Sequence, residues 1–141
     1  MSGAVERAAE SFRRQGGNVI HRSPYVVAAA MQFEARLEAM PAYFARTRWL
    51  YDALQAHPVI RVNPAAPQAN MLHLHLPVSR TRALAIRNAI AEEHKIWLFT
   101  RASHAALPDT SYVELYVGDN LLNMADADVK RALEIFADAL A

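Results

Sequence analysis

Residues 70–77 read NMLHLHLP, and this stretch decides the fold. Leucines occupy positions 72, 74 and 76 and alternate with a methionine at 71 and histidines at 73 and 75. Because successive side chains of a strand point to opposite faces, this period of two predicts a strand with one buried face and one polar face. Such a strand needs neighbouring strands and an apolar layer on its leucine side.

A second strand is expected just before this one. From His57 onward, Val59, Arg61 and Asn63 alternate with Ile60 and Val62. Residues 64–67 read PAAP, which is typical of a turn. The two strands are therefore expected to be antiparallel neighbours.

Helices and further strands follow. Ser79 has the residue type of an N-cap and predicts a helix to about Lys95. The apolar run IWLF at 96–99 predicts a short buried strand, and YVELYVG at 112–118 predicts the last strand. A final helix is expected behind Asp126. Its apolar stripe consists of Val129, Ala132, Leu133, Phe136 and Leu140.

From residue 57 the expected order is strand, strand, helix, strand, strand, helix. This order favours an α/β fold of the α+β type: a small, mainly antiparallel sheet with helices on one face. We therefore expect residues 57–141 to form a small C-terminal α/β domain, preceded by two or three helices.

Residues 1–56 show no strand pattern. Residues 4–14 have a helical composition and end at a glycine pair, residues 25–40 predict an alanine-rich helix, and Pro41 fits the first position of a further helix. The run YVVAAAMQF in the second of these is more apolar than a free helix surface. We expect residues 1–56 to be a helical linking segment that normally packs on a large domain.

Composition narrows the function classes. Fifteen basic and fourteen acidic residues are spread along the chain, for a net charge of +1, so we expect neither a nucleic-acid nor a membrane partner. The longest apolar run is too short to span a bilayer, and the first 17 residues carry charges in place of a signal core. The chain has no cysteine, which fits a cytoplasmic location.

Three short motifs occur in an order found in a known enzyme family. They are Gly16-Gly17-Asn18 before the alanine-rich helix, VIRVNP at 59–64, and QANM at 68–71. With these motifs, nearly the whole chain resembles the C-terminal part of the threonine aldolase and β-eliminating lyase family, fold-type I enzymes that use pyridoxal phosphate. In that family this region is the small domain with the helices that join it to the large domain.

The resemblance implies that the parent enzyme uses pyridoxal phosphate and that the partner of this segment is a large cofactor-binding domain or a second copy in a homo-oligomer. Such enzymes hold the cofactor as a Schiff base on a lysine. This chain has only Lys95 and Lys130, and neither has the small, polar loop context of a cofactor lysine. The family's lysine lies upstream of the glycine break. We therefore expect the isolated chain to hold no cofactor, to contain no catalytic residue and to be inactive.

Two positions depart from the family pattern. The family usually has a third glycine and then Met-Arg-Gln, whose arginine helps to hold the cofactor phosphate; here Arg22 is the candidate for that role. The family also places a carboxylate-binding arginine on its penultimate strand, where this chain has Glu114 as the candidate substrate-binding residue. A glutamate would repel an amino-acid carboxylate, which predicts a different substrate.

Other functions stay open. His73 and His75 lie about 6.6 Å apart on one strand face, a spacing that suits two metal ligands, but no third ligand can be assigned and no metal site is predicted. The chain is expected to be a fragment of a lyase of amino-acid metabolism. The alternatives are a free-standing small-ligand binding or regulatory module, and a structural subunit that docks on a separate large-domain protein.

Overall fold

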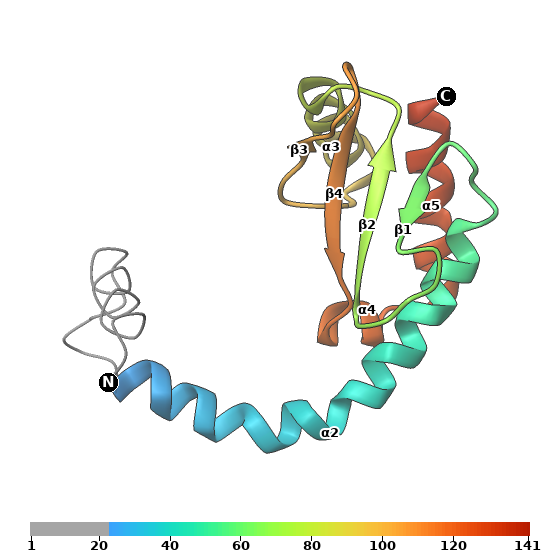
Figure 1. Ribbon diagram of the computed structural model, residues 1–141. Coiled ribbons are helices and arrows are strands. Elements are labelled where there is room, and N and C mark those ends of the chain that lie inside the picture. Colours follow the sequence, from blue (N-terminus) through green and yellow to red (C-terminus); the bar gives the residue numbers. More distant parts are fainter. Residues whose placement is uncertain (1–22) are drawn as a thin grey trace. The chain divides into compact units, whose positions relative to one another are not determined.

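The computed structural model describes residues 23–141 (Figure 1). The chain divides into two units between Glu38 and Ala39. The helix expected over residues 4–14 and the glycine break after it lie outside the described residues. That residues 1–56 link this domain to a large domain stays a prediction.

A single long helix, α2, runs from Ser23 to Leu54. The prediction that Pro41 separates two helices is wrong, because Pro41 lies inside α2. A proline removes one helical hydrogen bond and costs about 3 kcal/mol, but most residues around it are strong helix formers such as alanine, leucine, glutamate and methionine. Burial of Leu50 and Leu54, each 1% exposed, also holds the end of the helix in place. These contributions offset the cost of the proline.

Four strands form one antiparallel sheet in the order β1-β2-β4-β3. Their bounds are Arg61–Asn63 for β1, Met71–Leu76 for β2, Ser103–His104 for β3 and Ser111–Tyr116 for β4. The pair β2 and β4 is matched along its whole length, from Met71 opposite Tyr116 to Leu76 opposite Ser111. The predicted antiparallel sheet and its mixed α/β class are confirmed.

Helices α3 (Arg80–His94) and α5 (Asp126–Leu140) lie on the same face of this sheet (Figure 1). Ser79 caps α3 as predicted, since its hydroxyl accepts a hydrogen bond from the Arg82 backbone N–H at 3.3 Å. The stripe predicted for the last helix is buried, and its members Val129, Leu133, Phe136 and Leu140 join the three leucines of β2 in one core. Within residues 23–141, no helix combines the length and the apolar character that crossing a bilayer requires.

Three short segments differ from the sequence-based expectations. Residues 96–99 form no strand, although Phe99 is buried with its ring 5.7 Å from that of Phe136. A short apolar run has the same pattern whether it pairs in a sheet or only packs in a core, so periodicity could not separate the two. The strand β3 and the short helix α4 (Asp119–Asn123) were not predicted, because two and five residues are too short to show a period.

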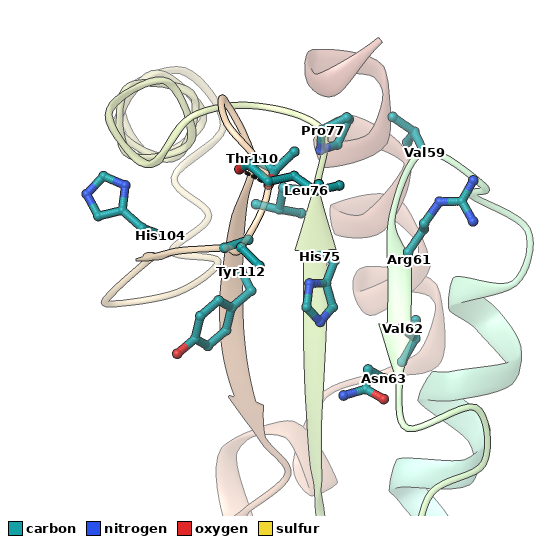
Figure 2. Close-up of a pocket in the computed structure, with 13 residues that line it drawn as sticks. Val59, Arg61, Val62, Asn63, His75, Leu76, Pro77, His104, Thr110 and Tyr112 are labelled. Atoms are coloured by element: carbon teal, nitrogen blue, oxygen red, sulfur yellow. Dashed lines mark hydrogen bonds between the residues drawn. The ribbon is translucent and has the colours of Figure 1, made fainter.

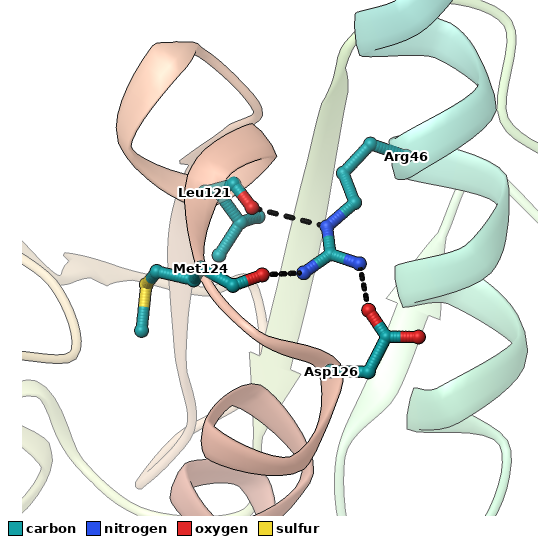
Figure 3. Close-up of polar contacts among 4 residues, drawn as sticks. All are labelled: Arg46, Leu121, Met124 and Asp126. Carbon is teal, nitrogen blue, oxygen red and sulfur yellow. Dashed lines mark hydrogen bonds and ion pairs between the residues drawn. The ribbon is translucent and has the colours of Figure 1, made fainter.

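Arg46 connects the second half of α2 to residues 121–126, which comprise the end of α4, the short link after it and the first residue of α5 (Figure 3). Its Nε donates to the Leu121 carbonyl at 3.0 Å, its Nη2 donates to the Met124 carbonyl at 2.7 Å, and its Nη1 pairs with the Asp126 carboxylate. The guanidinium also lies 4.0 Å from the centroid of the Trp49 ring. The Arg46 side chain is only 10% exposed, so water competes little for its bond to the Leu121 carbonyl, whereas the bonds to Met124 and Asp126 lie at the surface.

We expect Arg46→Gln to lower the free energy of unfolding by about 2–3 kcal/mol, because it removes the donors of two carbonyls as well as the ion pair. Asp126→Asn is expected to cost less than about 1 kcal/mol, since exposed ion pairs contribute little and this carboxylate is 59% exposed. Urea denaturation of both variants measures the two changes. Equal losses would contradict this description, because they would place the energy in the ion pair alone.

Candidate functional site

The sheet has a polar face opposite α3 and α5, and no helix of residues 39–141 covers it (Figure 1). We call it the open face. By strand register it carries Arg61 and Asn63 from β1, Met71, His73 and His75 from β2, and Tyr112, Glu114 and Tyr116 from β4. All of these side chains are half-buried or exposed, whereas the leucines between them on β2 are buried. The two-sided strand predicted from residues 70–77 is therefore confirmed.

His73 and Glu114 lie opposite each other at the centre of the open face. The distance from His73 Nε2 to Glu114 Oε1 is 3.7 Å, which is too long for a hydrogen bond. His73 Nε2 is buried and has no hydrogen-bond partner. The Tyr112 ring lies against both histidines, with ring centroids 5.5 Å from His73 and 5.9 Å from His75. The centre of the face is thus aromatic and polar, with one hydrogen-bonding atom unsatisfied.

The structure places the candidate site residues as follows. Glu114 lies on β4 with its side chain 50% exposed, next to His73; that it faces a substrate stays a prediction. Arg22 lies outside the described residues. Lys95 ends α3, where its Nζ donates to the Glu92 carbonyl at 2.7 Å, and Lys130 is exposed on α5. Both lysines are exposed, and neither lines any of the four cavities described in residues 23–141. That the isolated chain holds no cofactor stays a prediction.

A cavity of about 690 Å³ adjoins the open face at the end of β2. Figure 2 shows Arg61, His75 and Tyr112 side by side on three adjacent strands along it. Asn63 and His104 also line it. Its size lies in the range of small-molecule sites, which is about 300–1,000 Å³. A guanidinium, an amide and aromatic rings can together hold a small planar or anionic group.

Sequence reasoning found part of this arrangement. The strand predicted at 112–118 puts Tyr112 and Glu114 on one face by alternation. Alternation gives the face of a residue and not its cross-strand neighbours, so Arg61 and Asn63 could not be placed beside them. The two histidines of β2 share the face as expected. Among residues 23–141, no three histidine, aspartate or glutamate side chains lie close enough together to bind a metal ion.

Solved structures show which fold this is. The chain superposes on a protein assigned as an aromatic amino acid β-eliminating lyase/threonine aldolase from Exiguobacterium, with a TM-score of 0.73 and 22% identity, over 98% of this chain and 38% of that one. An L-allo-threonine aldolase assigned in Listeria monocytogenes matches with a TM-score of 0.69 and 26% identity, over 96% and 36%. The chain has the fold of part of a threonine aldolase-like enzyme.

More distant structures share this fold. A Sphingomonas paucimobilis serine palmitoyltransferase with a bound pyridoxal phosphate–myriocin aldimine matches at 15% identity and a TM-score of 0.54, over 79% of this chain and 27% of that one. No family model and no curated protein matches the sequence. The chain spans less than two-fifths of the length of the threonine aldolase-like neighbours, which is consistent with a C-terminal small domain. The resemblance stated from the sequence motifs is thus confirmed by the structure neighbours.

The unsatisfied His73 predicts a difference between two matched variants. His73→Leu should raise the free energy of unfolding by about 1 kcal/mol relative to His75→Leu, because it removes a buried nitrogen that has no partner. Both substitutions remove a histidine from the same face of β2, so they differ mainly in that nitrogen. Thermal or urea unfolding measures the difference. A larger stability loss in His73→Leu than in His75→Leu would show instead that the contact with Glu114 stabilises the fold.

Proposed function

We propose that the chain is the C-terminal part of a pyridoxal-phosphate-dependent amino-acid lyase of the threonine aldolase type, and that it is inactive alone. The observation that carries this proposal is the match over 96% and 98% of this chain to only 36% and 38% of two threonine aldolase-like neighbours. The sequence resemblance, which places the small domain and its joining helices in this region, supports the same assignment. The lack of cysteine supports a cytoplasmic location.

The cofactor belongs to the parent enzyme in this proposal. Pyridoxal phosphate supplies an electron sink for bonds at the substrate Cα when it is bound. Neither Lys95, which bonds to its own helix, nor Lys130, which is exposed, suits its attachment. We assign the cofactor lysine to the part of the parent enzyme that this chain does not cover, and Arg22 to a position beside the cofactor phosphate.

Glu114 is the proposed substrate-side residue of this segment. It stands on the open face beside His73, and it is negatively charged where the family has a cation. Two carboxylates repel each other, so Glu114 disfavours a substrate carboxylate at that position. The parent enzyme is therefore proposed to act on a substrate other than threonine.

The exposed apolar residues in the first half of α2 support the proposal that this segment packs on a partner. Six large apolar residues there are 55% to 80% exposed: Tyr25, Val26, Val27, Met31, Phe33 and Leu37. At 100° per residue, Val26, Phe33 and Leu37 share one side of the helix, whereas Val27 and Met31 lie on another. A helix that is apolar on two sides is normally enclosed by protein. We propose that the large domain and a neighbouring subunit enclose it in a homo-oligomeric parent enzyme.

The second candidate function is a free-standing small-ligand binding module. The cavity of about 690 Å³ beside Arg61, His75 and Tyr112 favours it, because this cavity lies within a single unit of the chain. A monomeric chain that binds a small amino-acid-like ligand would support this candidate over the fragment of a lyase.

The lysine assignment predicts how the isolated chain reacts with pyridoxal phosphate. After borohydride reduction and peptide mapping, we expect slow, substoichiometric labelling shared between Lys95 and Lys130, because neither lies in a pocket that would hold the cofactor. The variants Lys95→Arg and Lys130→Arg serve as controls, and each should lose only its own share. Stoichiometric labelling of one lysine, abolished by its own arginine variant, would show that the chain binds the cofactor itself.

The exposed part of α2 predicts self-association of the isolated chain, since pairing two apolar surfaces removes both from water at about 25 cal/mol per Å². Val27→Glu should weaken the dimer about 100-fold or more, because it buries an unpaired charge. Gln32→Glu is the matched control: it adds the same charge to the same helix, away from both apolar sides. Sedimentation equilibrium measures all three proteins. A monomeric parent chain at high micromolar concentration would refute the prediction.

A further inference from the structure

A second cavity, which we call the basic hollow, lies between α3 and the segment that follows it. It has a volume of about 530 Å³. Its basic and hydroxyl-bearing lining residues are Arg80, Arg87, Arg101, His104, Thr100 and Ser103. The lining includes no aspartate or glutamate. Cationic groups from two segments of the chain thus meet at one hollow without a carboxylate among them.

Two of the arginines are held in place by backbone carbonyls. Arg80 Nε donates to the Ala102 carbonyl at 3.0 Å, and Arg87 Nη1 donates to the Thr100 carbonyl at 2.7 Å. None of the ion pairs described in residues 23–141 includes Arg80, Arg87 or Arg101. The carbonyls therefore fix the side chains without neutralising them. An anion that binds here loses less side-chain entropy than one that binds free surface arginines.

The three guanidinium groups differ in the donors they still offer. Arg87 uses Nε and Nη2 on the Asn88 amide oxygen, so it mainly contributes charge. The hydrogen bonds described for residues 23–141 use neither terminal nitrogen of Arg80 and no nitrogen of Arg101. Arg80 also begins α3, whose first turn has no acidic residue to offset the positive end of the helix dipole.

We propose that the basic hollow binds a small phosphate-bearing molecule. Guanidinium groups match the oxygens of phosphate in paired hydrogen bonds, and the Thr100 and Ser103 hydroxyls supply further donors. The ligand is a small metabolite and not a nucleic acid, because the net charge of the chain is only +1. Arg82, two residues after Arg80, lines a different cavity together with Glu93 and Asp138. The basic hollow is thus a local feature and not the edge of a larger basic surface.

Inorganic phosphate is the probe that tests this site. The full chain is titrated with phosphate at constant ionic strength, with chloride as the balancing anion, while NMR follows the amides of residues 100–104 and the Arg80 Nε–H. Saturable shifts at these groups are expected. Arg101→Gln should weaken the binding about tenfold, because it removes charge-assisted hydrogen bonds. Arg101→Lys, which keeps the charge but loses the fork of donors, should cause a smaller loss.

Arg131→Gln, which removes an exposed arginine of α5, is the matched control and should leave the affinity within about twofold. Unfolding midpoints of all variants show whether Arg101→Gln keeps its fold. If it does not, the phosphate affinities of Arg101→Lys and Arg131→Gln are compared instead, and a weaker affinity in Arg101→Lys supports the site. Equal shifts with chloride alone, or equal weakening by Arg131→Gln and Arg101→Gln, would overturn the proposal, because binding would then depend on total charge. The outcome is independent of the proposed lyase function, since it requires neither pyridoxal phosphate nor a large domain.

Discussion

The burial of one side of β2 is the constraint on which the domain depends. Leu72, Leu74 and Leu76 are at most 4% exposed, and each must leave water on the same side of the strand. The stripe of α5, the buried face of α3 and the end of α2 meet on that side in one core. Arg46 then secures α2 through bonds to the segment before α5. The positions of α3, α5 and the end of α2 thus follow from the need to cover these leucines.

The same alternation forces polar groups onto the other side. His73 and His75 cannot enter the core while the leucines occupy it, so the open face keeps an unsatisfied imidazole nitrogen, a half-exposed Glu114 and a cavity. Within residues 39–141 the open sheet face has an unsatisfied atom, and the first half of α2 exposes apolar residues on two sides. Both are explained if this chain is one part of a larger enzyme.

The strand β2, the Ser79 cap and the apolar stripe of α5 could be predicted from the sequence, because each depends on local periodicity or on one side-chain hydrogen bond. It failed at residues 96–99, where an apolar run packs in the core without pairing, and at Pro41, where burial of the end of α2 offsets a local helix breaker. The position of Glu114 could be predicted, but its contact with His73 and the row of Arg61, His75 and Tyr112 depend on cross-strand register. The basic hollow could not be predicted, because Arg80 and Arg87 are separated in sequence from Arg101 and only the tertiary structure places them around one cavity.

The most direct measurement is the sequence of the transcript upstream of the codon for Met1. If the chain is the C-terminal part of a threonine aldolase-like lyase, the frame of Met1 continues upstream for a stretch longer than the chain itself, because the chain spans only 38% of its Exiguobacterium neighbour. That stretch should encode the lysine that holds pyridoxal phosphate. An in-frame stop codon directly upstream would contradict this assignment and would make a free-standing domain the better explanation.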